Sequence, residues 1–327
     1  MSVCPAEAVA PDLRSGSLRE VIQALPAAAA DRAVLVLVLE AQGSTYRKPG
    51  AVLLRGGEAA VGWLSGGCLE AELDLVAAQV LAHDRARVHA FDTHGDDDLL
   101  FGSASGCRGA VTLLLLPVHG AHPLVAALQA LGEALGMLEL TLGEDGAGSA
   151  RIDAQTWAWP ASAPGGARQW TLRLPPPPRL LLLGVGPEAA PLIRHARALG
   201  WQVDAVEHRG RWRSHARDAD RLVDAPPEAA WAQLDPARYR AAVVMSHHYG
   251  HDLVHLQHLQ PSRIGYVGLL GPPARRDALL TALGAAASSL IPRLHAPVGL
   301  RLGGEGPAAI ALGILAELQR HLTEPAA

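Results

Sequence analysis

The chain has 327 residues, which is long enough for two domains that each bury a hydrophobic core. Its formal net charge is only −4, without the one-sided basic field that nucleic-acid binding normally needs. Hydrophobic residues make up 49% of the chain, but the longest apolar runs have the length of strands and are far too short to span a membrane. These properties argue against a nucleic-acid-binding protein and against a membrane protein.

The amino-terminal residues include Glu7 and Asp12 and contain no basic start that leads into an apolar stretch, so no secretory signal is predicted. Three cysteines, Cys4, Cys68 and Cys107, are too few and too scattered for a disulfide framework or for a zinc site of the CxxC type. We therefore expect free thiols in a cytoplasmic protein.

The first half of the chain alternates helical and strand-like patterns, as in an α+β domain. Helices are predicted over residues 18–30, from residue 69 onward and over 121–136, and strands over 34–39, 51–55, 59–64, 88–91 and 111–116 and in short pieces within 137–174. The strand at 34–39 leads into a loop with a glycine at each end, residues 43–50. The backbone amides of this loop, together with Arg47 and Lys48, are suited to binding an anion. Lys48 is the only lysine in the chain and indicates a point-charge contact, although a lysine kept by chance is an equally good explanation.

A second glycine loop, residues 65–70, closes a predicted hairpin whose turn contains Gly56 and Gly57. A helix is predicted directly after it from apolar residues at helical spacing: Leu69, Leu73, Val76 and Val80. Cys68 therefore stands in or beside the first turn of that helix, where the helix dipole favours a thiolate. Such a thiolate is a soft ligand or a nucleophile, whereas the alternative is a small buried hydrophobic side chain beside a tight turn.

A third glycine-rich loop, residues 101–109, contains Cys107 and follows the acidic segment 92–98. The acidic segment lacks the spacing of a calcium loop, and the chain has no GxSxG elbow, Walker lysine motif or CxxC pair. No resident metal and no catalytic acid–base pair are therefore predicted. Cys107 resembles Cys68 in standing at the end of a glycine loop.

Four consecutive prolines, Pro175 to Pro178, form a stiff spacer and predict domains of residues 1–178 and 179–327. Beyond the spacer, strand-like runs at 180–183, 203–206, 241–245 and 264–270 alternate with helical stretches. This alternation predicts a Rossmann-like parallel sheet with crossover helices, and hence an α/β fold class. A final helix is expected to bury a stripe of three apolar residues: Ile310, Ile314 and Leu318.

The first strand of this second half runs into a GxGxxA turn at residues 184–189, and Glu207 follows at the end of the next strand. The pattern raises an NAD(P)-dependent oxidoreductase as an alternative function. Pro187, however, removes an amide from the helix start, and Glu188 places negative charge where a pyrophosphate would lie. A bare scaffold or a different phosphate ligand is therefore favoured over NAD(P).

The segment 246–252, rich in histidine, follows the third strand of the second half, where open α/β sheets place their ligand crevice. His251 and His255 stand one helical turn apart, which is a weak indication of a metal site. Exposed helix histidines are the favoured explanation, because no third ligand is evident.

With these motifs in view, the sequence resembles the XdhC/CoxI family, accessory factors that mature molybdenum hydroxylases such as xanthine dehydrogenase. The resemblance covers nearly the whole chain. In the first half it rests on residues 43–51, 66–70 and 106–109. In the second half it rests on the turn at Gly184, on 206–209, on Ser246, His247 and Asp252, on 268–271 and 296–300, and on Ala316 and Glu317.

The resemblance implies a chaperone more than an enzyme. Such a protein binds molybdenum cofactor, shelters it while a cysteine desulfurase installs the terminal sulfido ligand, and delivers it to an apo molybdenum hydroxylase. Whether two copies form a homodimer is left open. A scaffold that bridges the desulfurase and the apo-enzyme without touching cofactor is a third interpretation, but it leaves both glycine–thiol loops unexplained.

The cofactor joins a phosphorylated pterin to a soft dithiolene–metal end, so anion-binding loops and thiols are complementary to it. By the resemblance, Cys107 and Cys68 are the leading candidates for contact with it. The full set of expected cofactor contacts is Cys107, Cys68, Gly66, Gly67, Gly43, Ser44, Arg47, Lys48, Gly106, Gly184, Gly186, Glu207, His247 and Asp252.

Overall fold

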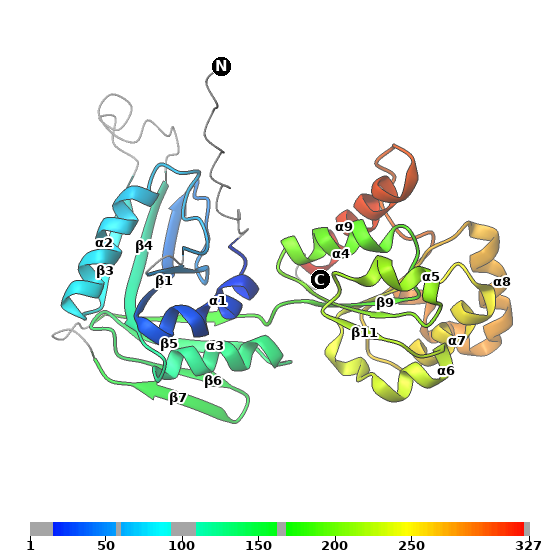
Figure 1. Cartoon of the computed structure of the whole chain (residues 1–327), viewed down its shortest axis with the longest axis horizontal. Coiled ribbons are helices and arrows are strands. Elements are labelled where there is room, and N and C mark those ends of the chain that lie inside the picture. Colours follow the sequence, from blue (N-terminus) through cyan, green and yellow to red (C-terminus); the bar gives the residue numbers. More distant parts are fainter. Residues whose placement is uncertain (1–15, 57–59, 93–108, 162–167, 324–327) are drawn as a thin grey trace, which may run out of the picture. The chain divides into compact units, whose positions relative to one another are not determined.

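The computed structural model describes residues 16–56, 60–92, 109–161 and 168–323 (Figure 1). The chain divides into two compact units, Met1–Pro176 and Pro177–Ala327, and the division falls inside the four-proline spacer. No helix in these described ranges is long and apolar enough to cross a membrane.

The first unit contains two four-stranded antiparallel sheets with the strand orders β2-β1-β4-β3 and β7-β6-β5-β8. Its elements are α1 (Leu18–Asp31), β1 (Ala33–Gly43), β2 (Val52–Arg55), α2 (Glu70–His83), β3 (Arg87–Asp92), β4 (Gly109–Val118), α3 (Pro123–Glu133), β5 (Leu138–Gly143), β6 (Gly148–Ile152), β7 (Gln155–Trp159) and β8 (Gln169–Leu174). Helix α1 begins after Ser17, whose hydroxyl caps it by accepting a hydrogen bond from the amide of Glu20.

Strand β1 is buried on both faces, which explains its unbroken apolar sequence. Alternate residues of a strand point to opposite faces, so its valines pack with the buried face of α2 and its leucines pack with α1, α3 and the second sheet. The buried residues of α2 include Leu73, Val76 and Val80, as the helical spacing predicts. The sheet therefore holds α2, and the loop before it, against one face.

The predicted hairpin strand at 59–64 is wrong in extent. Of its described residues only Val61 pairs, in a single bridge to β2. The buried guanidinium of Arg55 explains the difference, because it donates to the carbonyl oxygens of Val61 (3.3 Å) and Gly62 (3.0 Å) and forms an ion pair with Asp74 of α2. Beyond the backbone bonds between Leu54 and Val61, the side chain of Arg55 thus holds this segment beside α2.

The second unit confirms the predicted Rossmann-like fold. Its elements are β9 (Arg179–Leu183), α4 (Ala189–Ala198), β10 (Gln202–Val206), α5 (Gly210–Arg213), β11 (Arg221–Val223), α6 (Pro227–Ala230), β12 (Ala241–Val244), α7 (Tyr249–Leu259), β13 (Tyr266–Leu269), α8 (Pro273–Leu283), β14 (Leu294–His295) and α9 (Gly306–Thr323). Six parallel strands follow the order β11-β10-β9-β12-β13-β14, which is the usual Rossmann order, since β9 is the first strand and stands between the second and the fourth. Helices α4 and α9 pack on one face of the sheet, and α7 and α8 pack on the other.

Two details of the second unit differ from the predictions. Strands β11 and β14 were not predicted, because three and two residues are too few to carry a periodic pattern. In α9, Ile314 and Leu318 are buried as expected, but the side chain of Ile310 is exposed. Ala311 and Leu315 are buried in addition, so the buried stripe consists of Ala311, Ile314, Leu315 and Leu318.

Candidate functional site

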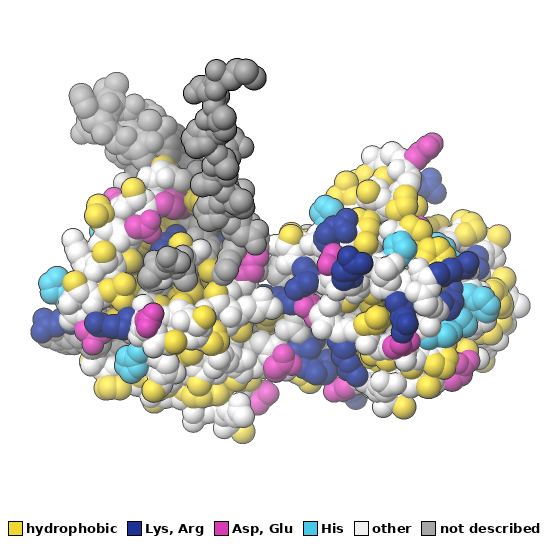
Figure 2. Space-filling view, in the orientation of Figure 1, with side chains coloured by type: hydrophobic (Ala, Val, Ile, Leu, Met, Phe, Trp, Pro, Cys, Tyr) yellow, Lys and Arg dark blue, Asp and Glu magenta, His cyan; other side chains and the backbone are white. Residues whose placement is uncertain are grey.

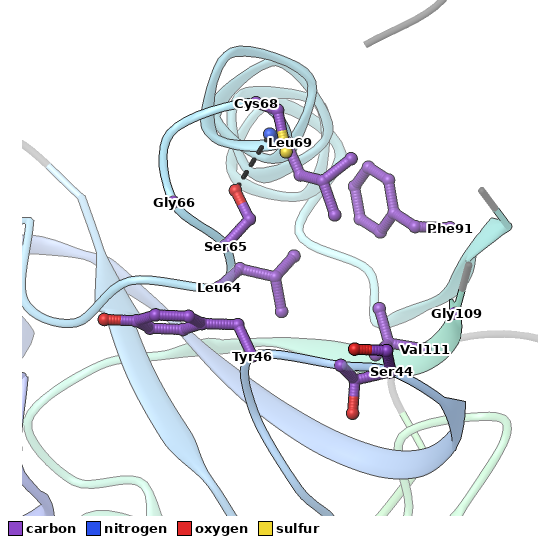
Figure 3. Close-up of a pocket in the computed structure, with 11 residues that line it drawn as sticks. Ser44, Tyr46, Leu64, Ser65, Gly66, Cys68, Leu69, Phe91, Gly109 and Val111 are labelled. Atoms are coloured by element: carbon purple, nitrogen blue, oxygen red, sulfur yellow. Dashed lines mark hydrogen bonds between the residues drawn. The ribbon is translucent and has the colours of Figure 1, made fainter. Parts of the chain in front are cut away.

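A cavity of about 400 Å³ lies in the first unit, between the loop after β1 and the loop before α2 (Figure 3). Most of its lining is apolar. It is lined by Ser44, Thr45, Tyr46, Leu64, Ser65, Gly66, Cys68, Leu69, Phe91, Gly109 and Val111. The structure therefore brings the first two glycine loops predicted from the sequence together around one space.

Glycines at the ends of β1 and β4 make this arrangement sterically feasible. Gly43 and Gly109 are paired across the sheet, and Gly43 has a φ of 67°, which side chains disfavour. A Cβ atom on Gly109 would lie 2.3 Å from the carbonyl oxygen of Ser44. The loop of residues 43–50 can cross the start of β4 only because Gly109 has no side chain.

The loop of residues 65–70 is held by its own carboxylate. Glu70 Oε1 accepts hydrogen bonds from the amides of Leu64 (3.0 Å) and Ser65 (2.9 Å), and Oε2 accepts one from the Ser65 hydroxyl (2.5 Å). Ser65 Oγ in turn accepts from the amides of Gly67 and Leu69, both at 3.1 Å, and Figure 3 shows the bond from Leu69. Burial raises the pKa of Glu70, but the hydrogen bonds from Ser65 and the backbone outweigh it and hold that pKa below its ordinary value.

Part of the expected anion-binding capacity of this loop is consequently used internally. The amides of Ser65, Gly67 and Leu69 are already hydrogen-bonded, which leaves those of Gly66 and Cys68 without a bond inside the described part of the loop. Cys68 is exposed, stands two residues before the start of α2 and lines the cavity. The alternative of a buried Cys68 is therefore wrong.

The two basic residues of the first loop have different roles. Arg47 donates from Nε to the carbonyl oxygen of Trp63 (2.7 Å) and from Nη2 to that of Gly16 (3.1 Å), so it joins the first loop to the chain that leads into the second. Lys48 is exposed, and its Nζ donates to Thr45 Oγ1 at 3.3 Å. Neither basic side chain lines the cavity itself.

Cys107 and Gly106 lie outside the described residues, as does the acidic segment beyond Asp92. In the described ranges no three His, Cys, Asp or Glu side chains are grouped so that they could hold a metal ion. Sequence reasoning missed Phe91 and Val111 as walls of the cavity and Glu70 as the anchor of the second loop. The short spacing of Ser65 and Glu70 around the two glycines was an available signal for the anchor.

The remaining predicted residues meet at the carboxyl ends of β9, β10 and β12 in the second unit. Glu207 is buried, and both of its oxygens are occupied. Oε1 accepts from the amide and Nε of Arg209 (both 2.8 Å), and Oε2 accepts from Arg209 Nη2 (2.6 Å) and the amide of Val185 (3.0 Å). Burial raises the pKa of Glu207, but these hydrogen bonds and the charge of Arg209 outweigh it and lower that pKa.

The glycine turn of this unit is tightly filled. A Cβ atom on Gly184 would lie 2.2 Å from the Cα of Ser246, and one on Gly186 would lie 2.6 Å from His247 Nε2 and 2.8 Å from Glu188 Oε2. His247 Nε2 and Glu188 Oε2 are themselves 3.1 Å apart. The space above the second glycine, which a pyrophosphate approaches in dinucleotide-binding Rossmann folds, is thus occupied by the protein's own side chains.

Asp252 and His255, both on α7, serve as internal anchors. Asp252 is fully buried and accepts hydrogen bonds from the Ser246 hydroxyl and from Arg275, with Nη2 at 2.5 Å. The Nδ1 atom of His255 accepts from the Trp231 indole at 3.2 Å, and burial, with a smaller contribution from neighbouring histidines, lowers the pKa of His255 to about 3. His255 is therefore a buried histidine and not the exposed helix histidine favoured from the sequence, and its Nδ1 atom is already bonded to Trp231.

The fold and the cavity define a two-unit α/β protein whose second unit is of the Rossmann type and whose first unit carries a cysteine-lined cavity between glycine loops. A model of the XdhC Rossmann domain matches residues 180–318, and a model of the XdhC and CoxI family matches residues 27–92. The chain belongs to the XdhC and CoxI family.

Similar proteins cover most of the chain. A protein from Bacillus subtilis (strain 168), named as a probable xanthine dehydrogenase subunit, is 28% identical over 332 residues, covering 88% of this chain and 92% of that protein. The molybdenum cofactor insertion chaperone PaoD from Escherichia coli (strain K12) is 26% identical over 294 residues, covering 88% of this chain and 82% of that protein. A crystal structure described as a xanthine dehydrogenase from Bacillus halodurans matches with a TM-score of 0.77 and 26% identity, covering 94% of this chain and 96% of that one.

Proposed function

We propose that this protein binds molybdenum cofactor, protects it during sulfuration and inserts it into an apo-enzyme of the xanthine dehydrogenase type. A role in molybdenum cofactor maturation is supported by the family and by the relative named as a molybdenum cofactor insertion chaperone. The single observation that carries the proposal is the exposed thiol of Cys68 at the edge of an apolar cavity between two glycine loops.

The shape and chemistry of the cavity suit the metal–pterin end of the cofactor. Its volume of about 400 Å³ lies within the range of small-molecule sites. The rings of Tyr46 and Phe91, with the side chain of Leu69, offer apolar surface to a flat heterocycle (Figure 3). A soft sulfur ligand at Cys68 is matched to a metal that already carries sulfur ligands. Cys107, two positions before Gly109 in the sequence, is the second proposed thiol contact.

We propose that the phosphate end of the cofactor lies beside the exposed Lys48 of the first loop. Glu70 already fills much of the amide-rich loop before α2, so that loop is poorly suited to a second negative charge. Lys48 is exposed and bonded to Thr45, which lines the cavity. Its ammonium is the proposed point-charge contact for the phosphate.

The transfer of sulfur is proposed to be the work of a cysteine desulfurase, with this chain holding the cofactor in a shielded position. The protein then acts as a carrier with two successive protein partners, the desulfurase and the apo-enzyme, in the cytoplasm. A scaffold that never touches the cofactor would not need a thiol exposed in an apolar cavity.

The proposal is tested by Cys68→Ala and Cys107→Ala, with Cys4→Ala as the matched control. The parent and the control are expected to retain cofactor when purified from a cofactor-producing host, whereas Cys68→Ala loses it by about tenfold or more because a metal–ligand contact is removed. Molybdenum analysis and fluorescence of the oxidised pterin report the content. Equal cofactor content in the parent and both loop variants would contradict the proposal.

A further inference from the structure

Three histidines at the carboxyl edge of the parallel sheet have no part in the proposed function. His208 follows β10, His248 caps the amino end of α7, and His251 lies in the first turn of α7. The ring centroids of His248 and His251 are 4.1 Å apart, and those of His208 and His251 are 5.2 Å apart. We call these three side chains the imidazole cluster.

The position of the imidazole cluster is one where Rossmann folds bind ligands. Strands β10 and β12 flank β9 in the sheet, so the rings meet over the carboxyl end of β9, where the strand order reverses. Figure 2 shows histidine and arginine side chains gathered next to one another on the visible face of the second unit. The cluster therefore joins segments that are distant in sequence at a topological ligand position.

A nicotinamide dinucleotide does not suit this position. The ribose of such a ligand needs free carboxylate oxygens on Glu207, but Arg209 and the amide of Val185 already fill them. The pyrophosphate needs the space over Gly186 that His247 and Glu188 fill. The ligand of this edge must therefore be recognised by other groups.

The cluster offers unused hydrogen-bond donors. His248 Nδ1 accepts a hydrogen bond from the amide of His251 at 3.3 Å, so in the neutral ring Nε2 carries the proton and is a donor. Within the described residues, the rings of His208 and His251 form no hydrogen bond, and all three side chains are at least partly exposed. Imidazole N–H groups beside a helix amino terminus are suited to an anion.

The charges around His251 favour a negative guest. Burial lowers the pKa of His251, and His248, Arg209 and His208 lower it further, against a raising effect of Glu207. Two carboxylates nearby are already neutralised, Glu207 by Arg209 and Asp252 by Arg275. A positive charge on His251 is repelled by His248, Arg209 and His208. An anion bound against the rings would offset this repulsion and so favour proton uptake by His251.

We propose that the imidazole cluster binds an oxyanion, either a free tetrahedral anion or the phosphoryl group of a larger ligand. The donors are the ring N–H groups of His208, His248 and His251, assisted by the dipole of α7. Binding is coupled to proton uptake by His251 and strengthens as the pH falls. The inference does not depend on the cofactor-carrier function, since the donors belong to the second unit alone.

The test measures binding of sulfate, whose charge is constant over the range used, to the full chain by calorimetry at about pH 6 and about pH 8. The expected affinity is about fivefold higher at the lower pH. His251→Gln is expected to weaken binding about tenfold, and His208→Gln, on a different strand, to weaken it similarly. His258→Gln is the matched control. His258 lies further along α7, where its ring stacks on Trp231, so this variant is expected to bind sulfate like the parent.

A phosphate monoester and NADH complete the experiment. A monoester that binds more tightly than sulfate identifies a phosphoryl ligand, and equal binding identifies a free oxyanion, so both results support the site. NADH is expected not to bind through the cluster. The proposal is overturned if sulfate does not bind, if its affinity is independent of pH, or if His251→Gln binds it as well as the parent does.

Discussion

The two units use glycine turns in opposite ways. In the first unit, Gly43 and Gly109 bring two loops around an open cavity whose wall carries the thiol of Cys68. In the second unit, Gly184 and Gly186 have almost no free space, because Ser246, Glu188 and His247 occupy it. A glycine pattern thus predicts a close backbone approach, whereas the neighbouring side chains decide whether a ligand or the protein itself fills the space.

Charge separates the units as well. Residues 1–176 hold 12 basic and 19 acidic side chains, a balance of −7, whereas residues 177–327 hold 16 basic and 13 acidic ones, a balance of +3. The small net charge of the whole chain conceals this difference. The expectation of an anion site at the imidazole cluster agrees with the sign of its own unit.

The largest expected loss of stability comes from adding a Cβ atom to a glycine that lies directly against neighbouring backbone. Gly184→Ala and Gly109→Ala each place a Cβ against backbone, 2.2 Å from Ser246 Cα and 2.3 Å from Ser44 O, and are expected to destabilise the protein by about 3 kcal/mol. Chemical unfolding measures the loss. The controls are Gly210→Ala and Gly66→Ala, where a Cβ meets nothing within 4 Å. Equal stability of variants and controls would show that the two kinds of glycine position do not differ.

A smaller effect is expected from Glu207→Gln. The amide cannot accept from Arg209 and Val185 with both ends, so about 2 kcal/mol of unfolding free energy is expected to be lost at neutral pH. Because the folded pKa of Glu207 is lowered, its contribution is present above the ordinary carboxyl pKa and disappears as the pH falls through the folded value. The difference between parent and variant should therefore shrink in acid. Glu228→Gln, on the exposed surface, is the control, and a pH-independent difference would argue against the internal role.

The smallest stability effect, about 1 kcal/mol, is expected from Glu70→Gln. The folded pKa of Glu70 is also lowered, so this contribution too is present at neutral pH and is lost as the pH falls. Its larger consequence is expected in cofactor content, because the loop that presents Cys68 loses its anchor. Glu72→Gln, two residues further along α2, is the control for cofactor content, because Glu72 bonds to His89 and to no group of the loop. Full cofactor content in the Glu70→Gln protein would show that the proposed site does not need this anchor.

The fold was predictable where periodicity was long. The alternating strands and helices of the second unit, and the helix after Cys68, followed from repeated apolar spacing. Apolar spacing could not predict the short strands β11 and β14 or the exposure of Ile310, because these features depend on tertiary neighbours. The predicted hairpin strand was wrong in extent because the side chain of Arg55 donates to the carbonyl oxygens of Val61 and Gly62. A pattern of polar and apolar residues does not encode this interaction.

The candidate site was predictable only in part. The two glycine loops were recognisable, but Phe91 and Val111 are ordinary strand residues until the chain folds, so nothing in the sequence distinguished them as cavity walls. The acid expected to meet a ribose, Glu207, is satisfied by an arginine two residues later, and that choice of partner is visible only in three dimensions. The role of Cys107 stays a prediction.

The bracing of the Cys68 loop by Ser65 and Glu70 has a kinetic consequence for the proposed carrier function. Because this loop is held by bonds within its own chain, we expect it to keep its conformation when the cofactor leaves, so that neither release nor rebinding requires the loop to unfold and refold. Successive cycles of cofactor binding and release could then start from the same loop conformation, and the rate of delivery would be set by the dissociation rate of the cofactor.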